Sequence, residues 1–225
     1  MERSLSHGQA IGDEFYSAYA AGTLDPALIL LVETQAALRE DVRRELHAAD
    51  TVAGVFLERE SPANMSEMSL TRTLNAIDKL DISAERNERA ARTAGSILDE
   101  LIVLPEPLKA KALAAAGEAG WKFGGPGLKV MPLELDSEAS VELLRIEPGH
   151  GAPRHSHSGQ EYTLVVTGGF TDENGSYGPG DLSIAGPHDT HQPIADPGET
   201  CYALAVSDGG RKFTGWLGVA QKLFG

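Results

Sequence analysis

The chain has 225 residues, and its 33 aspartate and glutamate residues outweigh 19 lysine and arginine residues, giving a formal net charge of −14 at pH 7. This acidity argues against direct binding to the phosphate backbone of DNA or RNA, which needs a basic surface, but it suits a basic protein partner. Hydrophobic residues make up 41% of the chain, enough for a sizeable core, and the single cysteine, Cys201, excludes an intramolecular disulfide. No stretch approaches the about 18 consecutive apolar residues of a membrane helix, so we expect a cytoplasmic protein without membrane contact.

Up to about residue 104, glycine and proline are sparse and apolar side chains recur three or four positions apart, which is the pattern of amphipathic helices. Asp25 followed by Pro26 predicts a helix start, because aspartate is a favoured N-cap residue and proline a favoured first helical residue. Asn64 and Glu67 have the spacing of a capping box. The predicted helices cover residues 13–21, 26–46, 50–57 (capped by Asp50), 64–77 and 83–101.

After residue 104, glycine and proline become dense and apolar residues come in short runs, which predicts strands from Trp121 onward. The expected strands include residues 141–146, 162–167 and 201–206, and Asn174-Gly175 is a hairpin signal. Many short strands separated by close turns indicate a sandwich or a barrel. The fold class is therefore predicted to be α+β in two domains, an N-terminal all-α helical bundle followed by a C-terminal all-β barrel.

The histidines are concentrated in this second half. Five of the seven fall between residues 150 and 191: His150, His155, His157, His188 and His191. His155 and His157 are two residues apart, so on a strand both side chains point to one face, and Glu161 has the same parity. His191 follows a hairpin that can return it to that face. Three imidazoles and one carboxylate suit zinc, iron(II), manganese, nickel or cobalt. The alternative is that these histidines are surface polar residues in a loop rich in glycine and proline.

A longer pattern surrounds these residues. The spacing Gly149-x5-His155-x-His157-x3-Glu161-x6-Gly168 matches the first cupin motif, and Gly180-x10-His191 supplies the histidine of the second. The match predicts a cupin barrel with one divalent metal held by His155, His157, Glu161 and His191, zinc being preferred and iron, manganese or nickel the alternatives. His150 and His188 are interpreted as non-ligands.

The whole chain resembles the ChrR-like anti-sigma factors, which join an N-terminal helical anti-sigma domain to a C-terminal cupin. The segments that carry the likeness are residues 18–24, 144–149, 153–157, 170–173, 177–181, 191–193, 197–199 and 213–215. The resemblance implies a helical domain over residues 1–90, a linker or helix end over 91–104 and a cupin over 105–225. Cupins often dimerise, so a homodimer through the cupin is compatible with the resemblance, and the sequence leaves the oligomeric state open. The resemblance also implies that the helical domain sequesters an extracytoplasmic-function sigma factor, and that the cupin senses an oxidative signal of the singlet-oxygen type and causes release.

One departure from the family pattern concerns the helical domain, which in the family usually holds a zinc ion through an N-terminal histidine and a His-x3-Cys-x2-Cys motif. His7 stands where the first ligand is expected, but the motif positions hold Gln35, Arg39 and Val42. None of these three is a good zinc ligand, and the charge of Arg39 would repel the ion. We therefore expect no zinc in the N-terminal domain.

Three further interpretations rest on single features. A cupin metalloenzyme of the dioxygenase type, with an appended helical domain, is the alternative to a regulator, because three histidines and one glutamate can also hold iron(II) with open positions. Cys201 lies in a strand pattern and is interpreted as a buried core residue; an oxidant-sensing thiol is the alternative. Tyr162 has the opposite parity to Glu161 and is expected to pack on the other face of its strand.

Overall fold

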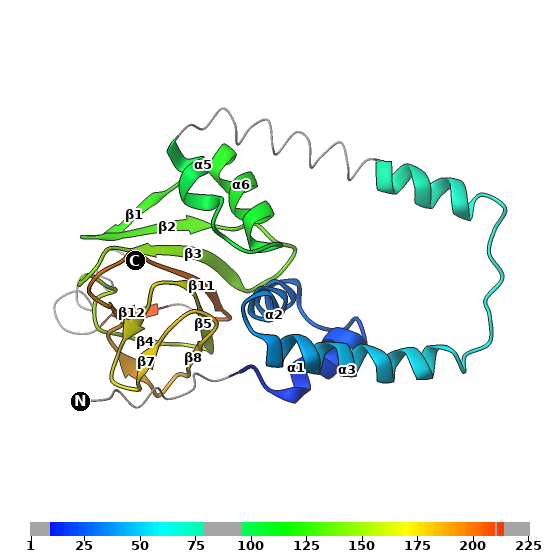
Figure 1. Ribbon diagram of the computed structural model, residues 1–225, viewed down its shortest axis with the longest axis horizontal. Helices are drawn as coiled ribbons and strands as arrows, with labels where there is room; N and C mark the ends of the chain where they lie inside the picture. The colour runs from blue at the N-terminus through cyan, green and yellow to red at the C-terminus, as the bar shows by residue number, and fades with distance from the viewer. Residues whose placement is uncertain (1–9, 79–95, 210, 214–225) are drawn as a thin grey trace.

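Helices form the first part of the chain in the computed structural model, which describes residues 10–78, 96–209 and 211–213 (Figure 1). They are α1 (Asp13–Ala20), α2 (Pro26–Leu38), α3 (Glu40–Leu57), a helical stretch over residues 69–78, α5 (Ser96–Leu101) and α6 (Leu108–Glu118). The predicted start of α2 is confirmed, because the Asp25 carboxylate accepts a hydrogen bond from the backbone N–H of Ala27 at 2.8 Å and Pro26 is the first helical residue. No described helix has the length and apolar character needed to span a membrane.

The predicted helix boundaries are wrong at three places. The helix predicted over residues 26–46 is broken at Arg39, whose extended backbone (φ −127°, ψ 121°) separates α2 from α3. The break predicted at Asp50 is absent, because this exposed residue continues α3 without acting as a cap. The fourth helical stretch covers residues 69–78 and so starts later than Asn64, and most of the helix predicted over residues 83–101 lies outside the described residues. Helix α6 was not predicted.

The strands form three antiparallel sheets within the described residues. The six-stranded sheet has the order β1 (Lys122–Gly125), β2 (Leu128–Pro132), β3 (Ser140–Ile146), β11 (Cys201–Ser207), β5 (Glu161–Thr167) and β8 (Leu182–Ala185). The two three-stranded sheets are β10 (Ile194–Ala195), β6 (Phe170–Thr171), β7 (Ser176–Tyr177), and β12 (Arg211–Phe213), β4 (His155–His157), β9 (Thr190–His191). This arrangement confirms the predicted α+β class, with sheets that pack as a sandwich rather than closing into one continuous barrel.

The central strands β5 and β11 of the six-stranded sheet are buried on both faces. On the inner face of the sheet, Cys201 and Ala203 of β11 and Val165 of β5 pack with Phe170 of β6. On its outer face, the residues of opposite parity pack against the helices, as the two-residue period of a strand requires. Tyr162 follows this rule and confirms its expected position, because its ring lies against that of Phe15 in an edge-on contact with centroids 5.8 Å apart.

Helix α2 lies between the outer face of the sheet and helices α1 and α3, and it contacts β11 and β5 on its sheet side (Figure 1). Leu30, Leu31 and Val32 are at most 3% exposed, and Thr34 and Gln35 are buried as well. A helix that is apolar all round is typical of one covered from every side. The helices and the sheet therefore share one hydrophobic core.

Candidate metal centre

The four residues predicted as metal ligands lie together inside the sandwich. His155 and His157 extend from the same face of β4, and β4 pairs with β9 so that His155 is directly opposite His191. Glu161 is the first residue of β5 and lies close to His157, with 3.7 Å between Glu161 Oε2 and His157 Nδ1. One donor atom from each of the four residues lies within 4.8 Å of the others. His150 and His188 are exposed and lie outside this cluster.

The cluster is shielded from solvent. His155, His157 and His191 are 1–2% exposed and Glu161 is 5% exposed. The imidazole rings pack with centroids 4.7–5.1 Å apart, and the Nε2 atoms of His157 and His191 approach to 3.0 Å. Burial lowers the pKa of His155 to about 4, which keeps its imidazole neutral at physiological pH. Three imidazoles beside a carboxylate, all converging on one point, are a donor set that fits a divalent cation.

Hydrogen bonds outside the cluster orient two of the imidazoles. The Nδ1 atom of His155 lies 2.8 Å from the carbonyl oxygen of Pro153, and the Nδ1 atom of His191 lies 2.8 Å from Asp172 Oδ2. Because a carbonyl or carboxylate oxygen can only accept, each Nδ1 carries the proton and each Nε2 is left with its lone pair. This is the tautomer in which both Nε2 atoms can bind a metal.

Asp172 contacts His191 from outside the cluster, and the sequence pattern did not identify it. Its side chain is fully buried. Burial by itself would raise the pKa of Asp172, but hydrogen bonds from His191 and from the backbone N–H groups of Asn174 and Gly175 bring it below its ordinary value. The carboxylate is therefore charged and supports His191 from behind. The Asn174-Gly175 hairpin signal, with an aspartate two residues before it, was the sequence feature that could have indicated this position.

Replacing Asp172 with asparagine is expected to weaken the binding of a divalent metal, measured with zinc, about 10- to 100-fold, because loss of a group that orients a ligand has a cost of that size. Asparagine keeps the shape but presents a weaker acceptor to His191 Nδ1. Titration against a chromophoric chelator measures the affinity. The matched control is Glu138→Gln, which removes one negative charge from an exposed side chain elsewhere. Equal zinc affinity for both variants would contradict a role for Asp172.

Cys201 is a core residue rather than a surface thiol. It is fully buried on β11, and burial, with the nearby charges of Asp196 and Glu199, raises its pKa to about 12. Since only the thiolate reacts, a rise from 9.0 to about 12 lowers the reactive fraction about a thousand-fold. We expect native protein to react with a thiol reagent at pH 8 at least about a thousand-fold more slowly than urea-unfolded protein. Fast labelling of the native protein would contradict this and would support the alternative that Cys201 is an oxidant-sensing thiol.

Comparison with known proteins gives consistent matches over nearly the whole chain. A family model described as the ChrR cupin-like domain matches residues 109–208. The anti-sigma-E factor ChrR of Cereibacter sphaeroides is 33% identical over 207 residues, which cover 92% of each chain. A crystal structure of Rhodobacter sphaeroides SigE in complex with the anti-sigma ChrR contains a chain that matches with a TM-score of 0.68 and 32% identity, over 89% of this chain and 98% of that one.

Proposed function

Because the chain belongs to the ChrR family of anti-sigma factors, we propose that it sequesters an extracytoplasmic-function sigma factor through its helical half and responds to a signal through its cupin. The observation that carries this proposal is that the similarity extends over both halves, since 92% of the chain aligns with an anti-sigma factor. The relative of known structure was solved in complex with SigE. In this proposal residues 1–90 bind the sigma factor and residues 105–225 form the sensor, so the chain is a regulator and not a dioxygenase.

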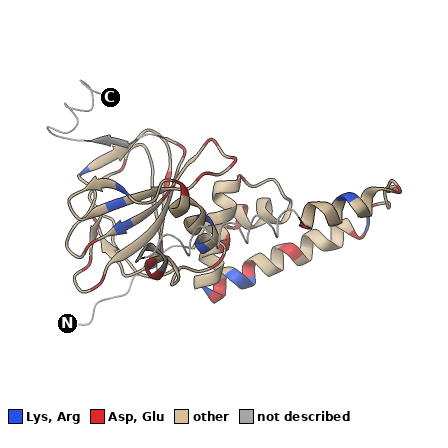
Figure 2. Ribbon diagram, turned by 90° about the horizontal axis from the view of Figure 1, so that it is seen from above, with Lys and Arg blue, Asp and Glu red and all other residues tan. Residues whose placement is uncertain are grey.

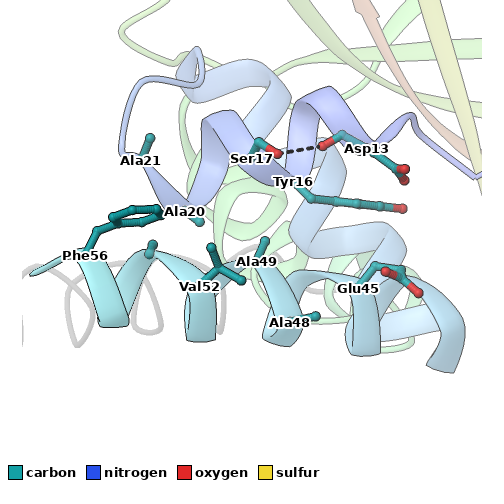
Figure 3. Close-up of a pocket in the computed structure, with 11 residues that line it drawn as sticks. Asp13, Tyr16, Ser17, Ala20, Ala21, Glu45, Ala48, Ala49, Val52 and Phe56 are labelled. Carbon is teal, nitrogen blue, oxygen red and sulfur yellow. Dashed lines mark hydrogen bonds between the residues drawn. The ribbon is translucent and has the colours of Figure 1, made fainter.

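A groove between α1 and α3 supports the assignment of the binding half. Its volume is about 490 Å³, and Figure 3 shows Tyr16 and Ala20 of α1 facing Ala49, Val52 and Phe56 of α3 across it. Val52 and Phe56 are 58% and 63% exposed, although apolar side chains of this size are usually buried. An exposed apolar groove bounded by two helices suits an amphipathic helix of a partner protein.

A second apolar face lies on the helical stretch over residues 69–78, which Figure 1 shows away from the sheets. Leu70, Leu74 and Ile77 are spaced four and three residues apart, so they share one side of the helix, and each is 47–66% exposed. A helix that presents such a face to solvent is suited to binding a partner. We propose that both surfaces contact the same sigma factor.

Charge supports the same partner. Helix α3 contains Glu40, Asp41, Glu45 and Asp50 beside Arg43 and Arg44, and Figure 2 shows further acidic positions on several loops. The formal net charge of −14 favours association with a partner that carries a basic, DNA-binding surface. Sequestering that partner needs no contact between this chain and nucleic acid.

The metal of the cupin is proposed to be zinc, held by His155, His157, Glu161 and His191. Zinc accepts three imidazoles and one carboxylate in a four-coordinate site, and when bound it would tie β4, β5 and β9 together. We propose that oxidative chemistry of the singlet-oxygen type at this site is the signal. In the helical half we propose no zinc: at the positions of the family's motif Gln35 and Val42 are buried and Arg39 pairs with carboxylates.

The experiment that tests the proposal is co-expression of the full chain with the extracytoplasmic-function sigma factor encoded beside it. We expect a stable complex after purification and loss of sigma-dependent transcription in a reconstituted assay. A sigma factor of a different group provides the control and should not be retained. Failure of the cognate sigma factor to bind would overturn the proposal. Oxygen uptake by the iron(II)-loaded protein in the presence of candidate diketone substrates would then test the dioxygenase alternative.

A further inference from the structure

The end of α2 is joined by polar contacts to the turn that leads into β8. Gln35 is 1% exposed, and its side-chain amide is used at both ends. Its Oε1 accepts from the backbone N–H of Ile11 at 3.3 Å, and its Nε2 donates to the carbonyl oxygen of Gly180 at 3.0 Å. A buried amide with such partners is costly to disturb, so Gln35 fixes the position of α2 relative to this turn.

Arg39 makes the second contact with the same turn. Its guanidinium pairs with both carboxylate oxygens of Asp41, at 2.6 and 3.0 Å, and with Asp181 at 3.4 Å. Gly180 has a φ of +85°, and a Cβ atom there would lie 2.7 Å from Cγ of Arg39. The turn therefore needs glycine both for its backbone conformation and for the close approach of Arg39.

On the cupin side, this turn is bonded to the strand that carries a proposed metal ligand. The N–H of Gly180 donates to the carbonyl oxygen of Val165 at 2.8 Å, and the N–H of Val165 donates to the carbonyl oxygen of Asp181 at 3.0 Å. Val165 belongs to β5, whose first residue is Glu161, and Glu161 is paired with Ala185 of β8. A displacement of Glu161 along β5 or β8 would reach the turn through continuous backbone hydrogen bonds.

On the helical side, Arg39 is the hinge between α2 and α3. It is the one extended residue between the two helices and the N-cap residue of α3, so its position sets the direction of α3. The groove lies between α3 and α1. Tyr16, which lines the groove, lies close to Asp41. Burial is the main cause that raises the pKa of the Tyr16 phenol, and the charge of the Asp41 carboxylate raises it further.

We propose that Gln35 and Arg39 form a latch, together with Gly180 and Asp181, through which the metal site controls the groove that binds the sigma factor. The inference rests on the proposed function and adds its means of regulation. With zinc bound, β5 and β8 hold the turn in place and the latch fixes α3. When zinc is lost, the turn loosens, the latch opens and α3 changes its angle to α1.

Hydrogen exchange on the full chain without a sigma factor tests the latch itself. Chelating zinc should speed amide exchange in residues 180–185 and also at the start of α3, where the N–H of Arg43 bonds to the carbonyl oxygen of Arg39. In Arg39→Met, which keeps the apolar stem against Gly180, the effect of zinc on α3 should disappear. Arg43→Met is the matched control, because its exposed ion pair with Glu40 stays within α3. If α3 in the wild-type chain does not respond to zinc, or responds equally in Arg39→Met, the latch is wrong.

The affinity for the sigma factor tests whether the latch controls the groove. Removing zinc should weaken binding by the wild-type chain at least about five-fold, the lower end of ordinary allosteric coupling. Arg39→Met opens the latch whether or not zinc is present, so it should bind the sigma factor about as weakly as zinc-free wild type and should not respond to zinc. Asp181→Asn weakens the same ion pair from the cupin side of the latch. It should behave as Arg39→Met does, and it replaces Arg39→Met in the test if that variant folds poorly.

The exchange and affinity experiments together distinguish failure of the latch from failure of the proposed function. If wild type binds the sigma factor equally with and without zinc, the latch fails and the proposed function stands. If wild type binds no sigma factor at all, the proposed function fails, and the exchange experiment alone decides whether the latch connects the two halves.

Discussion

Replacing His157 with alanine is expected to abolish tight zinc binding. His157 is 1% exposed and lies centrally in the cluster, 3.0 Å from His191 through the two Nε2 atoms and 3.7 Å from the carboxylate of Glu161. Removing this imidazole leaves three donors and a buried gap. We expect the affinity to fall about a thousand-fold or more, beyond the 10- to 100-fold typical of groups that only orient a ligand. Elemental analysis of the purified chain should change from one zinc per chain to none.

The same substitution should separate metal-dependent stability from folding. A ligand that binds only the folded state stabilises it by about 4 kcal/mol at a thousand times its dissociation constant, so zinc should raise the melting temperature of wild type and not of His157→Ala. Sigma-factor binding should persist in the variant, weakened by the several-fold that the latch transmits. The control is His188→Ala, an exposed histidine of the same region. One zinc per chain retained by His157→Ala would contradict the ligand assignment.

The sequence predicted that His155, His157, Glu161 and His191 lie together because their geometry follows from local rules. His155 and His157 share a face by the two-residue period of a strand, and the turn after β8 returns His191 opposite His155. Asp172 escaped prediction since its role depends on a contact across 19 residues with His191, and an isolated aspartate near a hairpin is usually only a turn residue.

The helix boundaries show the opposite case, in which tertiary contacts override local pattern. The apolar spacing continues from Leu38 to Val42, so the sequence predicts an unbroken helix. In the fold Arg39 is extended, and its guanidinium pairs with Asp41 and Asp181. Only one of these partners is near in sequence. From the family pattern alone, Gln35 and Arg39 are interpreted only as residues that replace zinc ligands. Their contacts with Gly180 and Asp181 could be seen only in the fold.

A negative charge in the groove between α1 and α3 is expected to abolish sigma-factor binding. Val52 is 58% exposed at the centre of the apolar wall, and replacing it with aspartate would require burying an unpaired carboxylate in the complex. Phe56→Ala removes the largest apolar side chain of the groove. Buried aromatic anchors are often worth 2 kcal/mol or more, so we expect binding to weaken about 30-fold for Phe56→Ala and at least about 100-fold for Val52→Asp.

These losses should not come from unfolding, because both side chains are largely exposed in the free chain and exposed substitutions usually change stability by less than about 0.5 kcal/mol. Two matched controls make the same chemical changes at exposed positions outside the groove: Val103→Asp, at 61% exposure, and Phe123→Ala, at 84%. Isothermal titration with the purified sigma factor measures all four variants, and zinc content and melting temperature confirm that each is folded. If the groove variants bind as tightly as the controls, the sigma factor does not use this surface, and the apolar face over residues 69–78 becomes the place to introduce the next charge.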